Sequence, residues 1–172
     1  MKSMTEPLRA ELKELYPHVE SLRIAGESIH VHLFSPSIRE QVEIAYKFLT
    51  HEFIPHARAE DLALYPVVQK VMGAKEATAT MSRDHGEVDR LTVELGDLLT
   101  KLDRAAITDE QANSMRRILF GLYALVKVHF AKEEEIYLLL DARLTEPEAA
   151  AMFEAMERAA QEVKSKLGVR GG

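Results

Sequence analysis

Residues 119–140, LFGLYALVKVHFAKEEEIYLLL, carry the pattern that decides the fold of this chain. Their apolar residues recur at helical spacing, which predicts one long amphipathic helix. His129 stands on the apolar stripe where an aliphatic residue would be expected, and Glu133 follows four residues later on the same face. Because a buried carboxylate is costly unless it is paired or bound to a metal, this HxxxE step predicts a polar partner elsewhere in the core.

Amphipathic patterns on both sides of this stretch predict further helices. They cover residues from about Thr5 to Gly26, from Ser35 to Gly73, from about Glu76 to Leu102, from Thr108 through the stretch above, and about 145–167. Pro55 and Pro66 interrupt the second of these, so kinks are expected there. We therefore expect one domain over residues 1–172 with an all-α fold. It comprises an antiparallel four-helix bundle over about residues 5–141 and an additional C-terminal helix packed outside the bundle.

Composition excludes several classes of site and partner. The chain has no cysteine, which excludes disulfides, zinc fingers and iron–sulfur clusters. Its net charge of -6 and its scattered Lys and Arg residues argue against nucleic-acid binding. No signal-peptide pattern and no apolar run of membrane-spanning length is present, so we expect a cytoplasmic protein with no membrane partner. We expect a monomer or a weak homodimer.

Each of the four long helices places a histidine on or beside its apolar stripe, and two of these histidines have a glutamate one turn later. The set is His18, His56 with Glu60, His85, and His129 with Glu133. Imidazoles and carboxylates in this combination suit iron, manganese or zinc. Six ligands are too many for one tetrahedral zinc, so the set favours two metals bridged by two carboxylates.

Simpler interpretations account for each residue taken alone. A single histidine on an apolar stripe is more often a hydrogen-bonded core residue, and one HxxxE pair is commonly a helix-stabilising contact. One histidine on each of four helices, with two HxxxE steps, is difficult to explain in this way, since the core would have to satisfy six polar groups. The ferritin-like di-iron bundles are disfavoured, because their signature is Glu-x-x-His with the glutamate first.

The pattern H…HxxxE…H…HxxxE resembles that of the hemerythrin-like family, the HHE cation-binding domains. The segments MSRDHGEVDRL and LYALVKVHFAKEEE also resemble the actinobacterial branch of this family. The resemblance covers about residues 12–140 and implies an antiparallel four-helix bundle around a non-haem di-iron centre, with two iron ions as cofactor. It further implies that His18 and His56 bind one iron, that His85 and His129 bind the other, and that Glu60 and Glu133 bridge the two.

The sequence departs from the oxygen-carrying members of this family on the third helix. Those proteins have HxxxH there, whereas Asp89 occupies the second position in this chain. One iron is therefore expected to be more open, or to take Asp89, water or a tyrosine as a ligand. Tyr65 follows Glu60 by five residues, next to Pro66, and Tyr137 lies one turn beyond Glu133. A core tyrosine with no metal contact is the alternative interpretation for both.

Three functions follow from such a site, and for the first two we expect a small molecule, O2, H2O2 or NO, as partner. The first is a peroxidase-like or catalase-like enzyme of oxidative or nitrosative stress defence that reacts with hydrogen peroxide, nitric oxide or dioxygen. The second is an oxygen-binding or iron-binding protein, or a sensor, without turnover. The third is a structural bundle in which the metal only stabilises the fold. The open iron favours the first, because a vacant position suits turnover.

Overall fold

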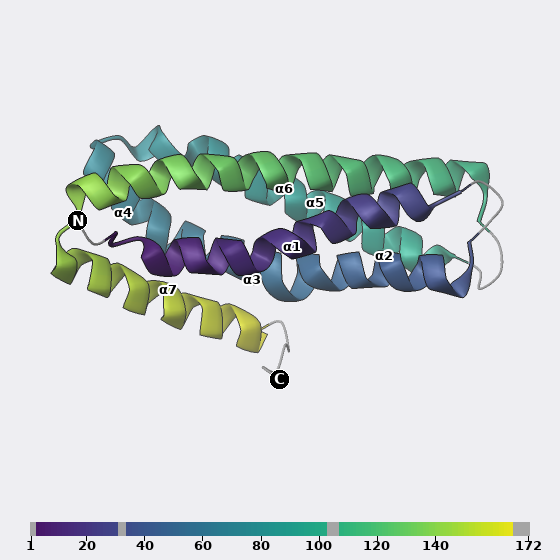
Figure 1. The fold of residues 1–172 in the computed structure, drawn as a ribbon, viewed down its shortest axis with the longest axis horizontal. Coiled ribbons are helices and arrows are strands. Elements are labelled where there is room, and N and C mark those ends of the chain that lie inside the picture. The colour runs from purple at the N-terminus through teal and green to yellow at the C-terminus, as the bar shows by residue number, and fades with distance from the viewer. Residues whose placement is uncertain (1–2, 31–33, 103–106, 167–172) are drawn as a thin grey trace.

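A computed structural model describes residues 3–30, 34–102 and 107–166 of the chain. The long helices lie along one another in an elongated bundle (Figure 1). They are α1 (Glu6–Ser28), α2 (Pro36–Phe48), α5 (Ala79–Lys101) and α6 (Asp109–Arg143). α1 packs against α2 and α6, and α5 packs against α6. The predicted all-α bundle is therefore confirmed.

The second of the four long segments of the bundle, here called the second arm, begins with α2 and continues through two wide, π-helical turns. These are η1 (Leu49–Phe53) and η2 (Glu60–Leu64), separated by α3 (Ile54–Ala59) and followed by α4 (Tyr65–Met72). Each wide turn ends two residues before a proline, Pro55 or Pro66. Proline lacks an N–H, and its ring clashes with the carbonyl of residue i−4, so a widened turn accommodates it.

Local signals in the sequence account for the ends of several helices. The Ser35 hydroxyl accepts a hydrogen bond from the backbone N–H of Ile38 at the start of α2. Thr108 and Gln111 form a capping box at the start of α6, with both reciprocal hydrogen bonds present. Gly73 ends α4 with a φ of 66°, a left-handed conformation that glycine adopts without strain. A short 3-10 helix, η3 (Lys75–Thr78), then leads into α5.

The last helix, α7 (Glu146–Lys166), lies outside the four-arm bundle and packs on α3 and η2 (Figure 1). Its buried residues include Met152, Met156 and Val163, which recur at helical spacing along one face. Between α7 and the bundle lies a pocket of about 410 Å³, whose lining includes Glu11 and His56. The C-terminal helix therefore covers the part of the bundle that holds His56.

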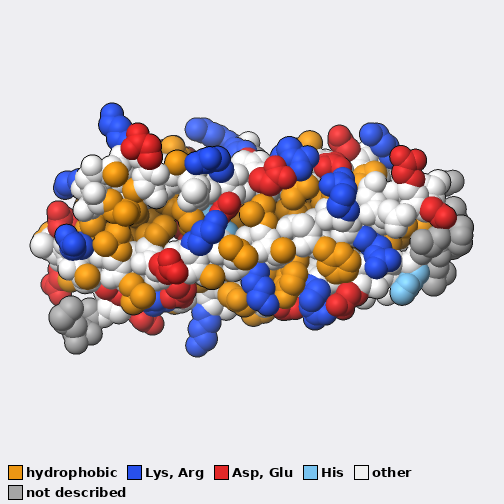
Figure 2. Space-filling view, turned by 90° about the horizontal axis from the view of Figure 1, so that it is seen from above, with side chains coloured by type: hydrophobic (Ala, Val, Ile, Leu, Met, Phe, Trp, Pro, Cys, Tyr) orange, Lys and Arg blue, Asp and Glu red, His pale blue; other side chains and the backbone are white. Residues whose placement is uncertain are grey.

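Acidic and basic side chains are interspersed over the face shown in Figure 2, with apolar side chains between them. Within the part of the chain that the structure describes, no helix combines the length and the hydropathy needed to cross a bilayer. Most of the large apolar residues are buried between the helices, where they form one hydrophobic core.

Candidate metal centre

Five polar side chains that the sequence singled out meet in the core of the bundle. They are His56 from α3, Glu60 from η2, His85 from α5, and His129 and Glu133 from α6. Each is no more than 6% exposed. The prediction that they bind metal remains a prediction, but the structure brings all five together.

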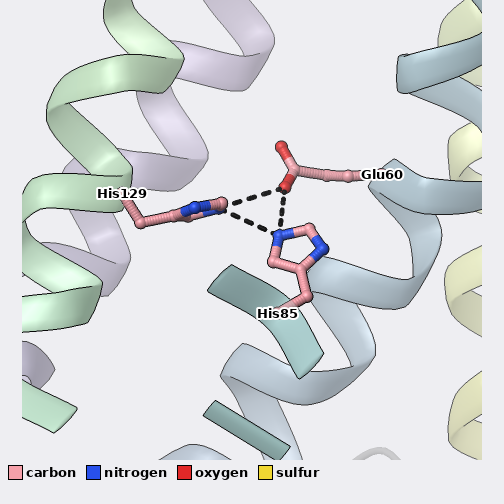
Figure 3. A group of neighbouring side chains, drawn as sticks. All are labelled: Glu60, His85 and His129. Atoms are coloured by element: carbon pink, nitrogen blue, oxygen red, sulfur yellow. Dashed lines mark hydrogen bonds and ion pairs between the residues drawn. The ribbon is translucent and has the colours of Figure 1, made fainter. Parts of the chain in front are cut away.

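Three of these side chains form a compact group, shown in Figure 3. The Nε2 atoms of His85 and His129 are 2.9 Å apart. Glu60 Oε2 lies 3.4 Å from His85 Nε2 and 4.0 Å from His129 Nε2. Two imidazole nitrogens and a carboxylate oxygen that converge in this way could hold one metal ion.

A second group of three, His56, Glu60 and Glu133, shares Glu60 with the first. His56 Nε2 lies 3.6 Å from Glu60 Oε1. Glu133 Oε1 lies 2.9 Å from His129 Nε2 and so reaches toward the first group as well. Since one carboxylate belongs to both groups, the arrangement suits two adjacent ions with Glu60 between them.

Unpaired polar atoms test whether this donor set fits a metal. Among the described residues, His56 Nε2 and Glu60 Oε1 are buried and have no hydrogen-bond partner. Leaving a buried polar group unpaired costs about 1–3 kcal/mol. A bound cation would satisfy both atoms, and the nitrogen and carboxylate donors are those that iron, manganese and zinc accept. The residues therefore fit a metal centre.

The charges of the cluster shift the pKa values of its members strongly. Burial alone would lower the pKa of His56, but Glu60 and the hydrogen bond to Glu11 raise it to about 9. Burial would also lower the pKa of His129, but the neighbouring carboxylates of Glu133 and Glu60 outweigh this effect and raise it to about 10. Burial would raise the pKa of Glu60, but His56 and the other two imidazoles lower it to about 2. Without metal the imidazoles therefore hold protons, which a binding metal must displace.

Two buried tyrosines contact the carboxylates of the cluster. The hydroxyl of Tyr65 donates to Glu60 Oε2 at 3.4 Å and lies 3.3 Å from His85 Nε2. The hydroxyl of Tyr137 donates to Glu133 Oε2 at 2.9 Å. Burial raises the pKa of both phenols, and the neighbouring carboxylates raise it further. Both tyrosines therefore hold their protons next to the site when no metal is bound.

The structure does not place His18 among the described residues that meet in the cluster, and its role as a ligand remains a prediction. Its exposed ring stacks on Phe48 at a centroid distance of 5.6 Å. Phe48 contacts Phe53, and the ring of Phe53 in turn contacts those of His85 and His129. One residue of helix corresponds to about 100° of rotation, so the burial of Val19 turns His18 away from the core.

Asp89, one of the alternatives for an additional ligand, also lies outside the cluster, and that role remains a prediction. Its side chain is 41% exposed and pairs with Arg58 at 3.3 Å. The preceding turn of α5 presents His85 to the core, and Val88 rather than Asp89 continues that buried face. Asp89 therefore occupies the solvent side of α5.

Three carboxylates that sequence reasoning missed contact the cluster from outside: Glu11, Asp61 and Asp84. Asp61 follows Glu60 and Asp84 precedes His85, so both resemble ordinary solvent-facing neighbours of buried residues. Glu11 lies one residue before the buried Leu12 and has no distinctive spacing. Their histidine partners are on other helices, so only the tertiary structure reveals the contacts.

The family model for the hemerythrin HHE cation-binding domain matches residues 6–138, which include all five buried polar side chains and stop before α7. No curated protein and no solved structure shows a significant match to the chain.

Proposed function

The chain belongs to the hemerythrin HHE cation-binding domain family, and from this premise we propose that it is a non-haem di-iron protein that reacts with hydrogen peroxide, nitric oxide or dioxygen. The observation that carries the proposal is the pair of buried donor groups that share Glu60. Its biological role would be peroxidase-like or catalase-like defence against oxidative or nitrosative stress.

The donor set itself favours a reactive centre. His85, His129 and Glu60 would hold one iron, and His56, Glu133 and Glu60 the other. Three imidazoles and two carboxylates leave positions free on two ions that accept up to six ligands, because His18 does not reach the cluster. Bound iron supplies redox chemistry toward small oxygen-containing and nitrogen-containing molecules.

Aromatic side chains restrict water around the five polar residues. Phe53 is fully buried, and its ring lies 6.1 Å from that of His129 and 6.3 Å from that of His85, measured between centroids. Phe130 is 1% exposed and lies 6.5 Å from His56. Excluding bulk water strengthens the electrostatic interactions in the site and limits side reactions.

The buried tyrosines would orient the carboxylates that bind metal. The Tyr137 hydroxyl donates to one oxygen of Glu133, and this leaves the other oxygen free toward the histidines. The Tyr65 hydroxyl donates instead to Glu60 Oε2, the oxygen that faces His85 and His129, and it is close enough to serve as an additional ligand if it loses its proton. A visible phenolate absorption band that disappears in Tyr65→Phe would identify that role.

The decisive experiment compares protein loaded with iron and with zinc. The iron form should contain two irons per chain, decompose hydrogen peroxide and consume nitric oxide faster when peroxide is present. The zinc form should fold equally well and do neither, because zinc has no accessible redox change. If both forms are equally inactive while the iron form binds dioxygen reversibly, the chain is an oxygen-binding or sensing protein without turnover.

A further inference from the structure

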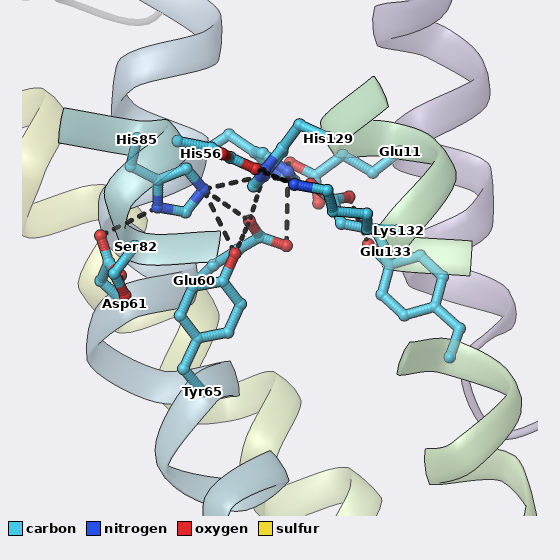
Figure 4. A network of polar contacts seen from close by, with 12 residues as sticks. Glu11, His56, Glu60, Asp61, Tyr65, Ser82, His85, His129, Lys132 and Glu133 are labelled. Carbon is cyan, nitrogen blue, oxygen red and sulfur yellow. Dashed lines mark hydrogen bonds and ion pairs between the residues drawn. The ribbon is translucent and has the colours of Figure 1, made fainter. Parts of the chain in front are cut away.

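All three histidines of the cluster share one feature: the Nδ1 atom of each donates to a carboxylate on a different helical segment. Figure 4 labels the three histidines and two of these carboxylates, Glu11 and Asp61. His56 Nδ1 lies 3.0 Å from Glu11 Oε1, which α1 contributes. His85 Nδ1 lies 2.9 Å from Asp61 Oδ2 of η2, and His129 Nδ1 lies 3.2 Å from Asp84 Oδ2 of α5. The three contacts have the same chemistry although they come from three different places in the fold.

The opposite nitrogen of each ring points into the cluster. The Nε2 atoms of His85 and His129 lie 2.9 Å apart, and that of His56 is buried without a hydrogen-bond partner among the described residues. An Nδ1–H that donates to a carboxylate leaves the Nε2 lone pair as the free donor on a neutral imidazole. The orientation is therefore the same in all three rings.

We propose that Glu11, Asp61 and Asp84 are positioning residues, which fix the rotation and the tautomer of the three histidines so that Nε2 is the atom offered to metal. A carboxylate on the second nitrogen of a metal-binding imidazole raises its basicity and locks its direction. The inference rests on the proposed metal centre and adds residues to it that do not touch the ions.

The positioning carboxylates are themselves held to different degrees. Asp61 accepts a hydrogen bond from Ser82 at 2.6 Å, and Asp84 pairs with Lys132 at 2.7 Å. Within the described parts of the chain, Glu11 has no hydrogen bond besides that with His56, and its side chain is 48% exposed in the pocket beneath α7. Glu11 is therefore the position where a substitution disturbs packing least and tests the inference most directly.

An ordinary ion pair between packed helices would also place a carboxylate beside a histidine. Paired substitutions separate the two roles, because an amide oxygen still accepts the Nδ1–H but carries no charge. Glu11→Gln and Asp84→Asn should retain most of the ring orientation, whereas Glu11→Ala and Asp84→Ala remove it. Asp97→Ala is the control, since Asp97 is exposed on α5.

The test uses zinc-loaded full-length protein. Long-range ¹H–¹⁵N correlation spectra report which nitrogen of each histidine binds the metal, and competition with a chelator reports affinity. We expect zinc on Nε2 of His56, His85 and His129, and a loss of about 10–100-fold in affinity in each alanine variant. The glutamine and asparagine variants should lose less, and Asp97→Ala should lose nothing. Circular dichroism of each variant shows whether it folds. If an Asp84 variant does not fold, Glu11→Gln and Glu11→Ala still test the inference, because Glu11 is half-exposed and its substitution disturbs packing least.

Two results would overturn the inference while leaving the proposed function intact. One is zinc bound through Nδ1 in the wild-type protein. The other is a folded Glu11→Ala variant with the affinity of the wild type. A wild-type chain that binds neither zinc nor iron would instead overturn the metal centre and the positioning role together.

Discussion

The two halves of α6 use the same apolar stripe for different purposes. The N-terminal half buries only apolar side chains: Ala112, Met115, Ile118, Leu119 and Leu122. The C-terminal half buries His129, Glu133 and Tyr137 on the continuation of that face. Both halves are equally inaccessible to water, so burial alone does not distinguish a packing segment from a binding segment.

The difference lies in what completes each half. Aliphatic side chains gain free energy from burial without a partner, about 2 kcal/mol for a large one. Burial removes the hydration of imidazoles and carboxylates, and this cost in free energy is offset only by hydrogen bonds, by protonation or by a bound metal. Stability of the polar half should therefore depend on solution conditions and ligands, whereas stability of the apolar half should not.

A cavity in the apolar half should produce the largest loss. Leu119 is fully buried, so Leu119→Ala should lower the free energy of unfolding by about 2–5 kcal/mol, as measured by denaturant titration. Iron content per folded molecule should stay unchanged. A variant that loses iron at unchanged stability would contradict this division between the halves.

Removing a histidine from the polar half should abolish the stabilisation that metal provides. His129→Ala should lose iron, and its melting temperature should no longer rise when metal is added. At a free metal concentration 100 times the Kd, the wild type gains about 2.7 kcal/mol by mass action. His51→Ala is the control, because His51 is exposed and bonded to Thr50. Metal loss in that variant instead would refute the ligand assignment.

The pH dependence of stability should distinguish the halves further. The pKa values of His56 and His129, about 9 and about 10 in the folded protein, exceed the value of about 6.5 expected in the unfolded chain. Their stabilising contribution is complete below about pH 6.5 and is lost as the pH rises through 9 and 10. Glu60, with a pKa of about 2, contributes above about pH 4.5 and loses its contribution as the pH falls toward 2.

Metal-free protein should therefore be most stable near pH 5–6 and weaken toward pH 10. Metal-loaded protein should show the opposite trend above pH 6, since the metal requires deprotonated imidazoles. Thermal melts of both forms across this range test the sign. Leu119→Ala should lower both curves without changing their shape, and a change of shape would contradict the comparison.

The smallest effect is expected at His18. Because its ring is exposed and stacked on Phe48, His18→Ala should change the free energy of unfolding by about 0.5 kcal/mol or less and should leave the iron content intact. Iron analysis and a thermal melt of the purified variant are sufficient. Loss of one iron per chain would restore the ligand role expected from the sequence.

Apolar periodicity was sufficient to predict the bundle and the last helix, because both depend on local spacing. The same spacing predicted the inward direction of His85, His129 and Glu133. It was not sufficient for His18, since a residue beside an apolar stripe can point either into the core or toward solvent. Glu11, Asp61 and Asp84 were not predictable, because their contacts join segments that only the tertiary fold brings together.

Within the wide turn η1, the buried residues depart from the regular helical spacing of α2. Regular spacing from Val42, Ala45 and Leu49 leads to Glu52, yet Glu52 is exposed and Phe53 is fully buried in its place. The same spacing continued from Glu52 reaches His56, which is buried, so the departure is confined to the wide turn itself. The turn therefore places an aromatic ring, 6.1 Å from that of His129 between centroids, where the spacing of α2 would have buried a further carboxylate.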